Sequence, residues 1–379
     1  MNKKIFLINM ESAGGMKAYT DAIAIALENI GFYDLIRVEL VYSDIKEITV
    51  EENNKKWIIY VPTKLKYYFF MFPKKIDEVV NNIIEKIGVE DAFFFITWPS
   101  YYLNNLYLPD DRTLLIIHDS RPHETSSNFL KKIGRKILYY RIKALSKKVK
   151  YIATNSRYQQ ISLEYMFKKK IFYFPMPPFA GVTLSKKICN EIASKKFNNY
   201  YLFFGRLEEY KGIDILIESV NILAQKFKMF PQVVIAGKGT IKKKYRKIIN
   251  KLDNILLIDR FLDDDEIGYL FSQAKCVIFP YKTVTQSGPL QYAYYFRKPV
   301  IVSGLSYFLE HFDFNNPPGL IHEAKSSISL AYTLYMFEHL SNSEIENFRN
   351  NSYKNYKKYF DFPIFTQELS NFLFKIMKG

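Results

Sequence analysis

The stretch "FFGRLEEYKG", residues 203–212, decides the fold. The apolar run at 200–204, which overlaps the start of this stretch, predicts a buried strand, and the periodic run at 213–227 predicts a helix. The stretch is therefore a turn that leads from a strand into a helix and carries two cations, Arg206 and Lys211. A repeated strand and helix alternation of this kind is typical of parallel α/β sheets.

Cations that converge at a helix start suit phosphate groups. The guanidinium of Arg206 can bind two oxygens, the ammonium of Lys211 adds a point charge, and the helix dipole helps both. The alternative is a solvated pair of cations bonded to Glu208 and Glu209, which is the commoner arrangement in proteins at large.

The same alternation runs through most of the 379 residues and is interrupted once, by the proline-rich stretch "FYFPMPPFAG" at 172–181. We expect two Rossmann-like α/β domains, at residues 1–178 and 179–360. Strand signals end near residue 325, and residues 361–379 read as a terminal amphipathic helix.

Composition restricts the function classes. The net charge of +16 is shared equally, with 27 basic and 19 acidic residues in each half of the chain. An even excess favours anionic ligands or an anionic surface and disfavours a nucleic-acid-binding protein. The two cysteines, Cys189 and Cys276, lie far apart and indicate a reducing, cytoplasmic setting. The longest aromatic run, at 67–72, ends at Pro73 and is too short to cross a bilayer.

Two loops of the N-terminal domain are candidate ligand contacts. Gly14 and Gly15 follow the first strand, where a turn without side chains lets the backbone approach another molecule. His118 follows a middle strand, and we weigh a hydrogen bond to a ligand against a histidine that caps the strand end. A metal site formed with its neighbours is disfavoured, because Pro122 excludes the helical spacing of a zincin motif; those neighbours are Asp119, His123 and Glu124.

Two loops of the C-terminal domain add to the turn at 203–212. "VVIAGKG" (233–239) ends in Gly237, Lys238 and Gly239, which is also a normal tight turn. In "FPYKTVTQSGPLQYAYYFRKPVIVSG" (279–304), a helix that starts near Ser287 offers backbone N–H groups to a diphosphate.

These motifs together resemble family 4 of the retaining glycosyltransferases. "GRLEEYKGIDILIES", "IAGKG", "DDDEIGYLFSQAKCVIFPY" and "KPVIVSG" occur in that family's order and approximate spacing. The resemblance implies the GT-B fold, in which two Rossmann-like domains face each other across a cleft and a C-terminal helix crosses back to the N-terminal domain. It also implies a nucleoside diphosphate sugar on the C-terminal domain and an acceptor on the N-terminal domain.

The resemblance assigns roles to individual residues. Arg206 and Lys211 match the cations that offset charge on the leaving diphosphate, and His118 matches a histidine near the donor sugar. Phe261 falls where the family contacts the base. The other expected donor contacts are Gly14, Gly15, Gly205, Gly237, Gln286, Ser287, Gly288 and Tyr292.

One departure from the family concerns its two glutamates in an E-x7-E arrangement. Val284 and Tyr292 occupy those positions here, and Gln286 is the nearest polar substitute. We interpret the chain as a variant branch. The rival hypothesis is a catalytically silent sugar-nucleotide-binding subunit that supports a partner transferase.

The family's mechanism requires neither a protein nucleophile nor a bound metal, so we expect a retaining hexosyltransferase without a cofactor. The run Asp263, Asp264 and Asp265 matches Asp-x-Asp in letters, but it stands where acidic residues cap a helix, so we do not interpret it as a metal-binding signature.

A basic segment suggests a membrane partner. Residues 131–150 contain nine Lys or Arg and no acid, interleaved with apolar residues at helical spacing. A solvated helix packed on the first sheet explains the spacing but not the missing acids, so we favour contact with anionic lipid headgroups. The aromatic and lysine-rich segment 64–75 is a second candidate contact. By analogy with the family, we expect a peripheral enzyme at the inner face of the cell membrane. It would act on a glycan or lipid-linked acceptor in the synthesis of a bacterial surface polysaccharide such as O-antigen, lipopolysaccharide or capsule.

Overall fold

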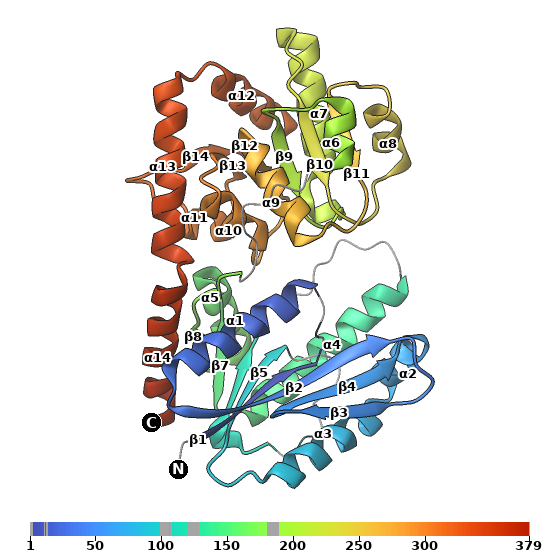
Figure 1. Cartoon of the computed structure of the whole chain (residues 1–379), viewed down its shortest axis with the longest axis vertical. Coiled ribbons are helices and arrows are strands. Elements are labelled where there is room, and N and C mark those ends of the chain that lie inside the picture. Colours follow the sequence, from blue (N-terminus) through green and yellow to red (C-terminus); the bar gives the residue numbers. More distant parts are fainter. Residues whose placement is uncertain are drawn as a thin grey trace. The chain divides into compact units, whose positions relative to one another are not determined.

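The computed structural model describes residues 3–10, 12, 14–98, 106, 108–119, 129–179 and 189–378. The chain forms two compact units (Figure 1). The first unit comprises Met1–Ala180 together with Phe362–Gly379, and the second comprises Gly181–Asp361. The terminal helix α14 (Phe362–Lys378) therefore belongs to the first unit, where it packs against α1 (Gly14–Ile30).

The first unit contains an eight-stranded sheet in the order β3-β4-β2-β1-β5-β6-β7-β8. Every strand pair is parallel except β3 with β4. Strand β3 was not predicted, because its sequence "TVEEN" is polar and its side chains are exposed. The strands are β1 (Lys3–Asn9), β2 (Tyr33–Ser43), β3 (Thr49–Asn53), β4 (Lys56–Pro62), β5 (Phe93–Trp98), β6 (Thr113–Ile116), β7 (Tyr151–Thr154) and β8 (Phe172–Tyr173).

Helices cover both faces of this sheet, with α1 and α3 (Lys74–Ile87) on opposite sides (Figure 1). Successive side chains of β1 point to opposite faces of the sheet. Phe6 and Ile8 share one face, where they belong to the hydrophobic cluster that includes residues of α3. The remaining helices of this unit are α2 (Lys66–Met71), α4 (Phe129–Lys148) and α5 (Arg157–Phe167), with short 3₁₀ turns at Thr63–Leu65 and Asp110–Arg112.

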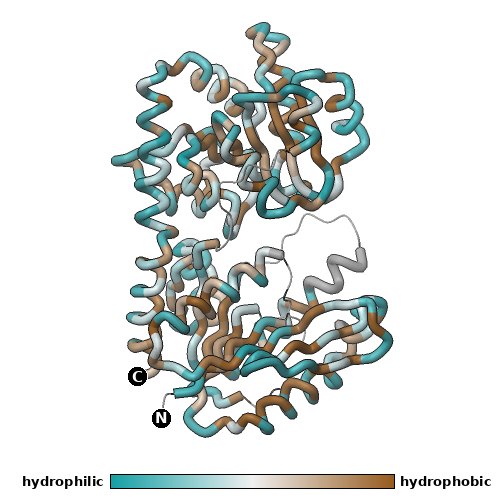
Figure 2. The backbone as a smooth tube through the Cα atoms, viewed as in Figure 1, coloured by the Kyte–Doolittle hydropathy of each residue, from teal (hydrophilic) through white to brown (hydrophobic). Residues whose placement is uncertain are grey.

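The second unit contains a six-stranded parallel sheet in the order β11-β10-β9-β12-β13-β14. Its four central strands, β10, β9, β12 and β13, are short, largely buried and almost wholly apolar, as expected for a sheet covered on both faces (Figure 2). The strands of this sheet are β9 (Tyr201–Phe204), β10 (Val233–Ala236), β11 (Ile255–Ile258), β12 (Cys276–Phe279), β13 (Val300–Ser303) and β14 (Gly319–His322).

The helices of the second unit follow its strands in the α/β manner. Asp263 caps α9 with a capping box, so the acidic run 263–265 does mark a helix start, as predicted. The helices are α6 (Asn190–Lys195), α7 (Ile213–Ile222), α8 (Lys243–Ile249), α9 (Asp264–Gln273), α10 (Gly288–Tyr295), α11 (Ser306–Glu310), α12 (Ser327–Glu338) and α13 (Asn342–Tyr359). A 3₁₀ turn (Glu209–Lys211) precedes α7, and a π-helical turn (Leu223–Phe227) follows it.

Glycines allow the ends of neighbouring strands to approach each other. Gly237, just after β10, has a φ of +141°. A Cβ at this position would lie 1.9 Å from the carbonyl oxygen of Gly205, just after β9. Both the backbone conformation and the space therefore require glycine at position 237.

We expect Gly237→Ala to lower the free energy of unfolding by about 3 kcal/mol, because alanine is strained at this φ and its Cβ meets backbone rather than a flexible side chain. Thermal unfolding should show a drop of roughly 6–12 °C. Gly304→Ala is the matched control, since its Cβ would make only ordinary contacts at 3.6 Å. Equal melting temperatures for the two variants would contradict this account.

Candidate functional site

Two loops meet at the carboxyl ends of β9 and β12, which are neighbours in the second sheet. We call residues 205–212 the cation loop and residues 280–288 the α10 loop. A Cβ at Gly212 would lie only 1.8 Å from the carbonyl oxygen of Pro280, and the backbone N–H of Lys282 donates to the Tyr210 carbonyl at 2.8 Å. The two loops are thus packed backbone to backbone.

Lys211 is buried in this junction, with 6% of its surface exposed. Its Nζ donates a hydrogen bond to the Tyr281 hydroxyl at 2.7 Å and lies 3.9 Å from the centre of the Tyr281 ring. Burial lowers the pKa of Lys211 to about 7; Arg206 adds to this effect and Glu208 opposes it. The solvated alternative therefore does not describe Lys211.

Arg206 is exposed, with 67% of its side-chain surface accessible. Its Nη1 donates to the Glu208 carboxylate at 3.1 Å, as the solvated alternative predicts for this residue, while Glu209 pairs with Lys242 instead. Exposed ion pairs of this kind are weak, so the guanidinium can exchange Glu208 for another anion. Its charge already acts on Lys211 and on Tyr281, which locates it close to both.

Helix α10 starts beside the cation loop. A Cβ at Gly205 would lie 3.8 Å from the Pro289 side chain in the first turn of α10, an eight-residue helix that begins at Gly288. Ser287 is its N-cap, yet the buried Ser287 hydroxyl makes no capping bond and lies instead beside the Tyr281 hydroxyl. Pro289 carries no N–H and the Leu290 N–H bonds the Ser287 carbonyl at 3.3 Å, so the helix start offers the N–H of Gly288. This N–H group, next to two cations, forms an arrangement suited to phosphate oxygens.

The other predicted residues of the second unit lie around this junction in different environments. Gly237 packs on the backbone of Gly205, so the fold requires glycine at this position whether or not a ligand binds there. Phe261 is 83% exposed beyond β11, the edge strand. The ring of Tyr292 packs against core aromatics, with ring centres 5.5 Å from Phe271 and 6.4 Å from Phe204. Gln286 is half-buried in the α10 loop.

The glycine pair of the first unit differs from the predicted turn. Helix α1 begins at Gly14, so Gly14 and Gly15 form its first turn and do not precede it. No atom lies within 4 Å of the position that a Cβ of Gly15 would take, so packing within the described residues does not require glycine there. The open space leaves the backbone of this turn accessible to another molecule.

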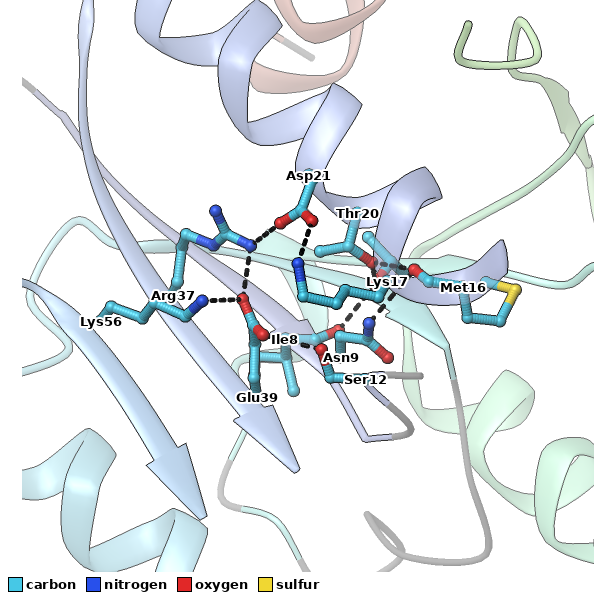
Figure 3. Close-up of polar contacts among 11 residues, drawn as sticks. Ile8, Asn9, Ser12, Met16, Lys17, Thr20, Asp21, Arg37, Glu39 and Lys56 are labelled. Atoms are coloured by element: carbon cyan, nitrogen blue, oxygen red, sulfur yellow. Dashed lines mark hydrogen bonds and ion pairs between the residues drawn. The ribbon is translucent and has the colours of Figure 1, made fainter. Parts of the chain in front are cut away.

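A buried ion network anchors the connection between β1 and α1 (Figure 3). The carboxylate of Glu39 is buried; it accepts a hydrogen bond from Ser12 at 2.7 Å and pairs with Arg37 and with Lys56 at 3.2 Å. Arg37 also bonds Asp21 on α1. Sequence reasoning missed this network, although the charges in "LIRVELVY" stand two residues apart and so share one face of the strand.

His118 is a buried residue of the first unit. Its Nε2 lies 2.8 Å from the carbonyl oxygen of Thr97, and its ring contacts Tyr19 and Trp98. It follows β6 by two residues, and not directly as expected. Two of its proposed metal partners, His123 and Glu124, lie outside the described residues.

Within the described ranges, three possible ligand atoms also gather in the second unit, from Cys189, Glu191 and Glu266, within 4.8 Å of one another. Arg260 bonds both carboxylates, at 2.7 Å to Glu191 and 2.6 Å to Glu266. Burial, with the adjacent Glu191, raises the pKa of the Cys189 thiol to about 11. A guanidinium between two carboxylates and a protonated thiol favour an ion-pair cluster over a metal site.

We expect Lys211→Met to raise stability relative to the wild type most strongly below pH 7. Below pH 7 the Lys211 amine of the folded wild type is protonated, so the fold bears the cost of a buried charge. Between pH 7 and about 10 this amine is neutral in the folded state but still protonated in the unfolded chain, so the free energy of unfolding of the wild type rises with pH. Urea denaturation at pH 6 and pH 9 measures both arms. The control is Lys243→Met, at an exposed lysine of α8. A stability gain independent of pH would show that Lys211 does not titrate in this range.

Solved structures with the same fold cover almost the entire chain. Sucrose-phosphate synthase from Thermosynechococcus elongatus has a TM-score of 0.73 at 15% identity, over 99% of each chain. HepE of Anabaena, in complex with UDP and glucose, has a TM-score of 0.66 at 14% identity, over 98% of this chain and 100% of that one. A UDP-forming α,α-trehalose-phosphate synthase from Burkholderia xenovorans has a TM-score of 0.71 at 11% identity, over 100% and 99%.

The sequence comparison is more local. No curated protein matches the chain. Residues 198–334, which contain the cation loop and the α10 loop, match the family described as "Glycosyl transferases group 1". The whole chain therefore has the GT-B fold of these structures, and residues 198–334, within its second unit, match a glycosyltransferase family.

Proposed function

We propose that the protein transfers a sugar from a nucleoside diphosphate sugar, and that its diphosphate binds where the cation loop meets the α10 loop. The observation that carries this proposal is the placement of a buried Lys211 and an exposed Arg206 beside the first turn of α10. HepE with UDP and glucose, and a UDP-forming synthase, share the fold, which supports a uridine nucleotide as the carrier.

The chemistry proposed for these groups is electrostatic. As the bond between sugar and phosphate breaks, negative charge grows on the leaving diphosphate, and fixed cations and N–H dipoles stabilise that charge. We propose that Arg206 and Lys211 supply the cations and that Ser287 and Gly288 supply the helix terminus, without a metal ion. Transfer with retention of anomeric configuration then needs no protein nucleophile.

The remaining proposed donor contacts follow from the same position of the diphosphate. We propose that the exposed Phe261 stacks on the base and that Gln286 and Tyr292 take over contacts that glutamates make elsewhere in the family. On the first unit, the open space at the Cβ position of Gly15 supports the predicted role of Gly14 and Gly15 as a turn that contacts the donor. We propose that His118, which is buried, contributes to the binding of the donor sugar.

We further propose that the first unit binds an anionic membrane surface and a lipid-linked glycan acceptor, in the synthesis of a bacterial surface polysaccharide. No helix in the described part of the chain is both long and apolar enough to span a bilayer, so the contact would be peripheral. On α4, Lys136, Tyr140, Lys143 and Lys147 share one helical face without an acid. Aromatic and aliphatic side chains on the neighbouring α5 are also exposed, namely Tyr158, Ile161 and Tyr165.

We expect Arg206→Ala to weaken UDP binding by about 10- to 100-fold, because it removes charge-assisted hydrogen bonds to phosphate. Titration calorimetry with UDP measures the effect. The matched control is Arg349→Ala, an exposed arginine that likewise pairs with a glutamate, Glu346, at 3.2 Å. Equal affinity in both variants, or no binding of any nucleoside diphosphate by the wild type, would refute the diphosphate site.

A silent subunit remains the rival function, because positions 284 and 292 carry no carboxylate. The two hypotheses differ in turnover. A transferase should slowly hydrolyse its donor sugar nucleotide and lose that activity in Arg206→Ala, whereas a silent subunit should bind the donor and release no free sugar.

We expect charge reversal of the α4 face, with Lys136→Glu, Lys143→Glu and Lys147→Glu together, to weaken binding to phosphatidylglycerol vesicles by at least about 100-fold. Vesicle co-sedimentation measures it. Reversal of Lys243, Lys244 and Lys247 on α8 changes the net charge equally and serves as control. A similar loss in both triple variants would mean that net charge, and not the α4 face, causes the attraction.

A further inference from the structure

Tyr281 is a fully buried tyrosine whose hydroxyl is directed at Lys211. It follows the end of β12 by two residues, and its ring is packed on several sides. Ring centres lie 5.8 Å away at Phe279, 5.3 Å away at Phe308 and 6.3 Å away at Tyr210. The hydroxyl therefore has a fixed position, set by the core of the second unit.

The pairing of Lys211 with a tyrosine is unusual for a buried cation. Buried ammonium groups are normally compensated by a carboxylate. The ionisable groups that face Lys211 are Arg206, Glu208, Tyr210 and Tyr281, and only Tyr281 is within hydrogen-bonding distance of Nζ among the described residues. A tyrosine fixes the direction of the ammonium and leaves its charge uncancelled, so the charge remains available to an incoming anion.

The contact continues toward α10. The Tyr281 oxygen accepts from Lys211, and the hydroxyl of Ser287, the N-cap of α10, is a second hydrogen-bonding neighbour of the same oxygen. Burial raises the pKa of Tyr281, while Ser287 and Arg206 lower it in part. Lys211, Tyr281 and the N-cap of α10 therefore form one row of polar groups behind the proposed diphosphate position.

We propose that Tyr281 is a positioning residue for the diphosphate, which holds the Lys211 amine in place, and that the amine takes up a proton when the diphosphate binds. The inference rests on the proposed donor site and adds a residue and a proton to it. No group is oxidised or transferred: one proton moves from solvent to Nζ, where it is shared with the bound phosphate oxygens.

The sign of the pH dependence follows from the site. With the pKa of Lys211 at about 7 in the free protein, a bound diphosphate that favours the cation must raise that pKa. Above pH 7, affinity for UDP should therefore fall by up to tenfold for each pH unit, because binding requires one added proton. In Tyr281→Phe the cation loses its hydrogen-bond acceptor, so the fall should begin at a lower pH.

The first test needs no ligand. In protein labelled with ¹³C at the lysine ε-carbons, the NMR signal assigned through Lys211→Met should titrate near neutral pH in the wild type. In Tyr281→Phe its midpoint should move to lower pH. Tyr200→Phe removes another buried hydroxyl, which donates to the Leu270 carbonyl at 2.9 Å, and should leave the midpoint unchanged. An unmoved midpoint in Tyr281→Phe overturns the positioning role.

The second test uses UDP and calorimetry at pH 6.5, 7.5 and 8.5. The wild type in buffers of different ionisation enthalpy should take up close to one proton at pH 8.5, and Tyr281→Phe should bind about tenfold more weakly than Tyr200→Phe at pH 7.5. Wild-type binding with no proton uptake at any pH overturns the proton-linked part, even if Tyr281→Phe fails to fold. Absence of UDP binding by the wild type instead refutes the donor site, and the NMR result still decides whether Tyr281 holds Lys211.

Discussion

The close packing of the Gly212 backbone on the Pro280 carbonyl is the constraint on which the candidate site depends. It brings together two turns that are about seventy residues apart in the sequence, after neighbouring strands of one parallel sheet. Once the backbones are in contact, only 6% of the Lys211 surface stays exposed, and its ammonium finds its hydrogen-bond partner, Tyr281, in the α10 loop. The burial of the cation, its lowered pKa and its bond to Tyr281 all follow from that contact.

The cations of the Glu39 network and those of the candidate site are compensated in opposite ways. In the first unit, Arg37 and Lys56 are paired with the buried Glu39, so their charges serve to anchor a connection within the fold. In the second unit, Lys211 donates a hydrogen bond to the neutral Tyr281 hydroxyl. Arg206 pairs with the exposed Glu208 carboxylate, and solvent weakens this ion pair. A cation that no buried carboxylate neutralises can bind phosphate oxygens, which is why we place the proposed function on the second unit.

Much of the site could be predicted because its parts are local. A strand that ends just before Gly205, a helix that begins at Gly288 and the acidic cap at Asp263 are each set by neighbouring residues. The errors are equally physical. Two glycines after the first strand predict a turn ahead of the helix, whereas α1 begins at Gly14 and includes both. The hydrophobic pattern did not predict strand β3, because this strand is polar and exposed and pairs only with β4.

The sequence by itself determined the α/β class, the two-part organisation and the order of the motifs, since these depend on periodicity and turn chemistry within short windows. Only the tertiary structure decided which residues share an environment. The partner of Lys211 is seventy positions away, and no local pattern separates a solvated lysine from one enclosed by Tyr210 and Tyr281. Burial, and with it the protonation of the amine, is a property of packed backbones, and it exists only after the two loops have met.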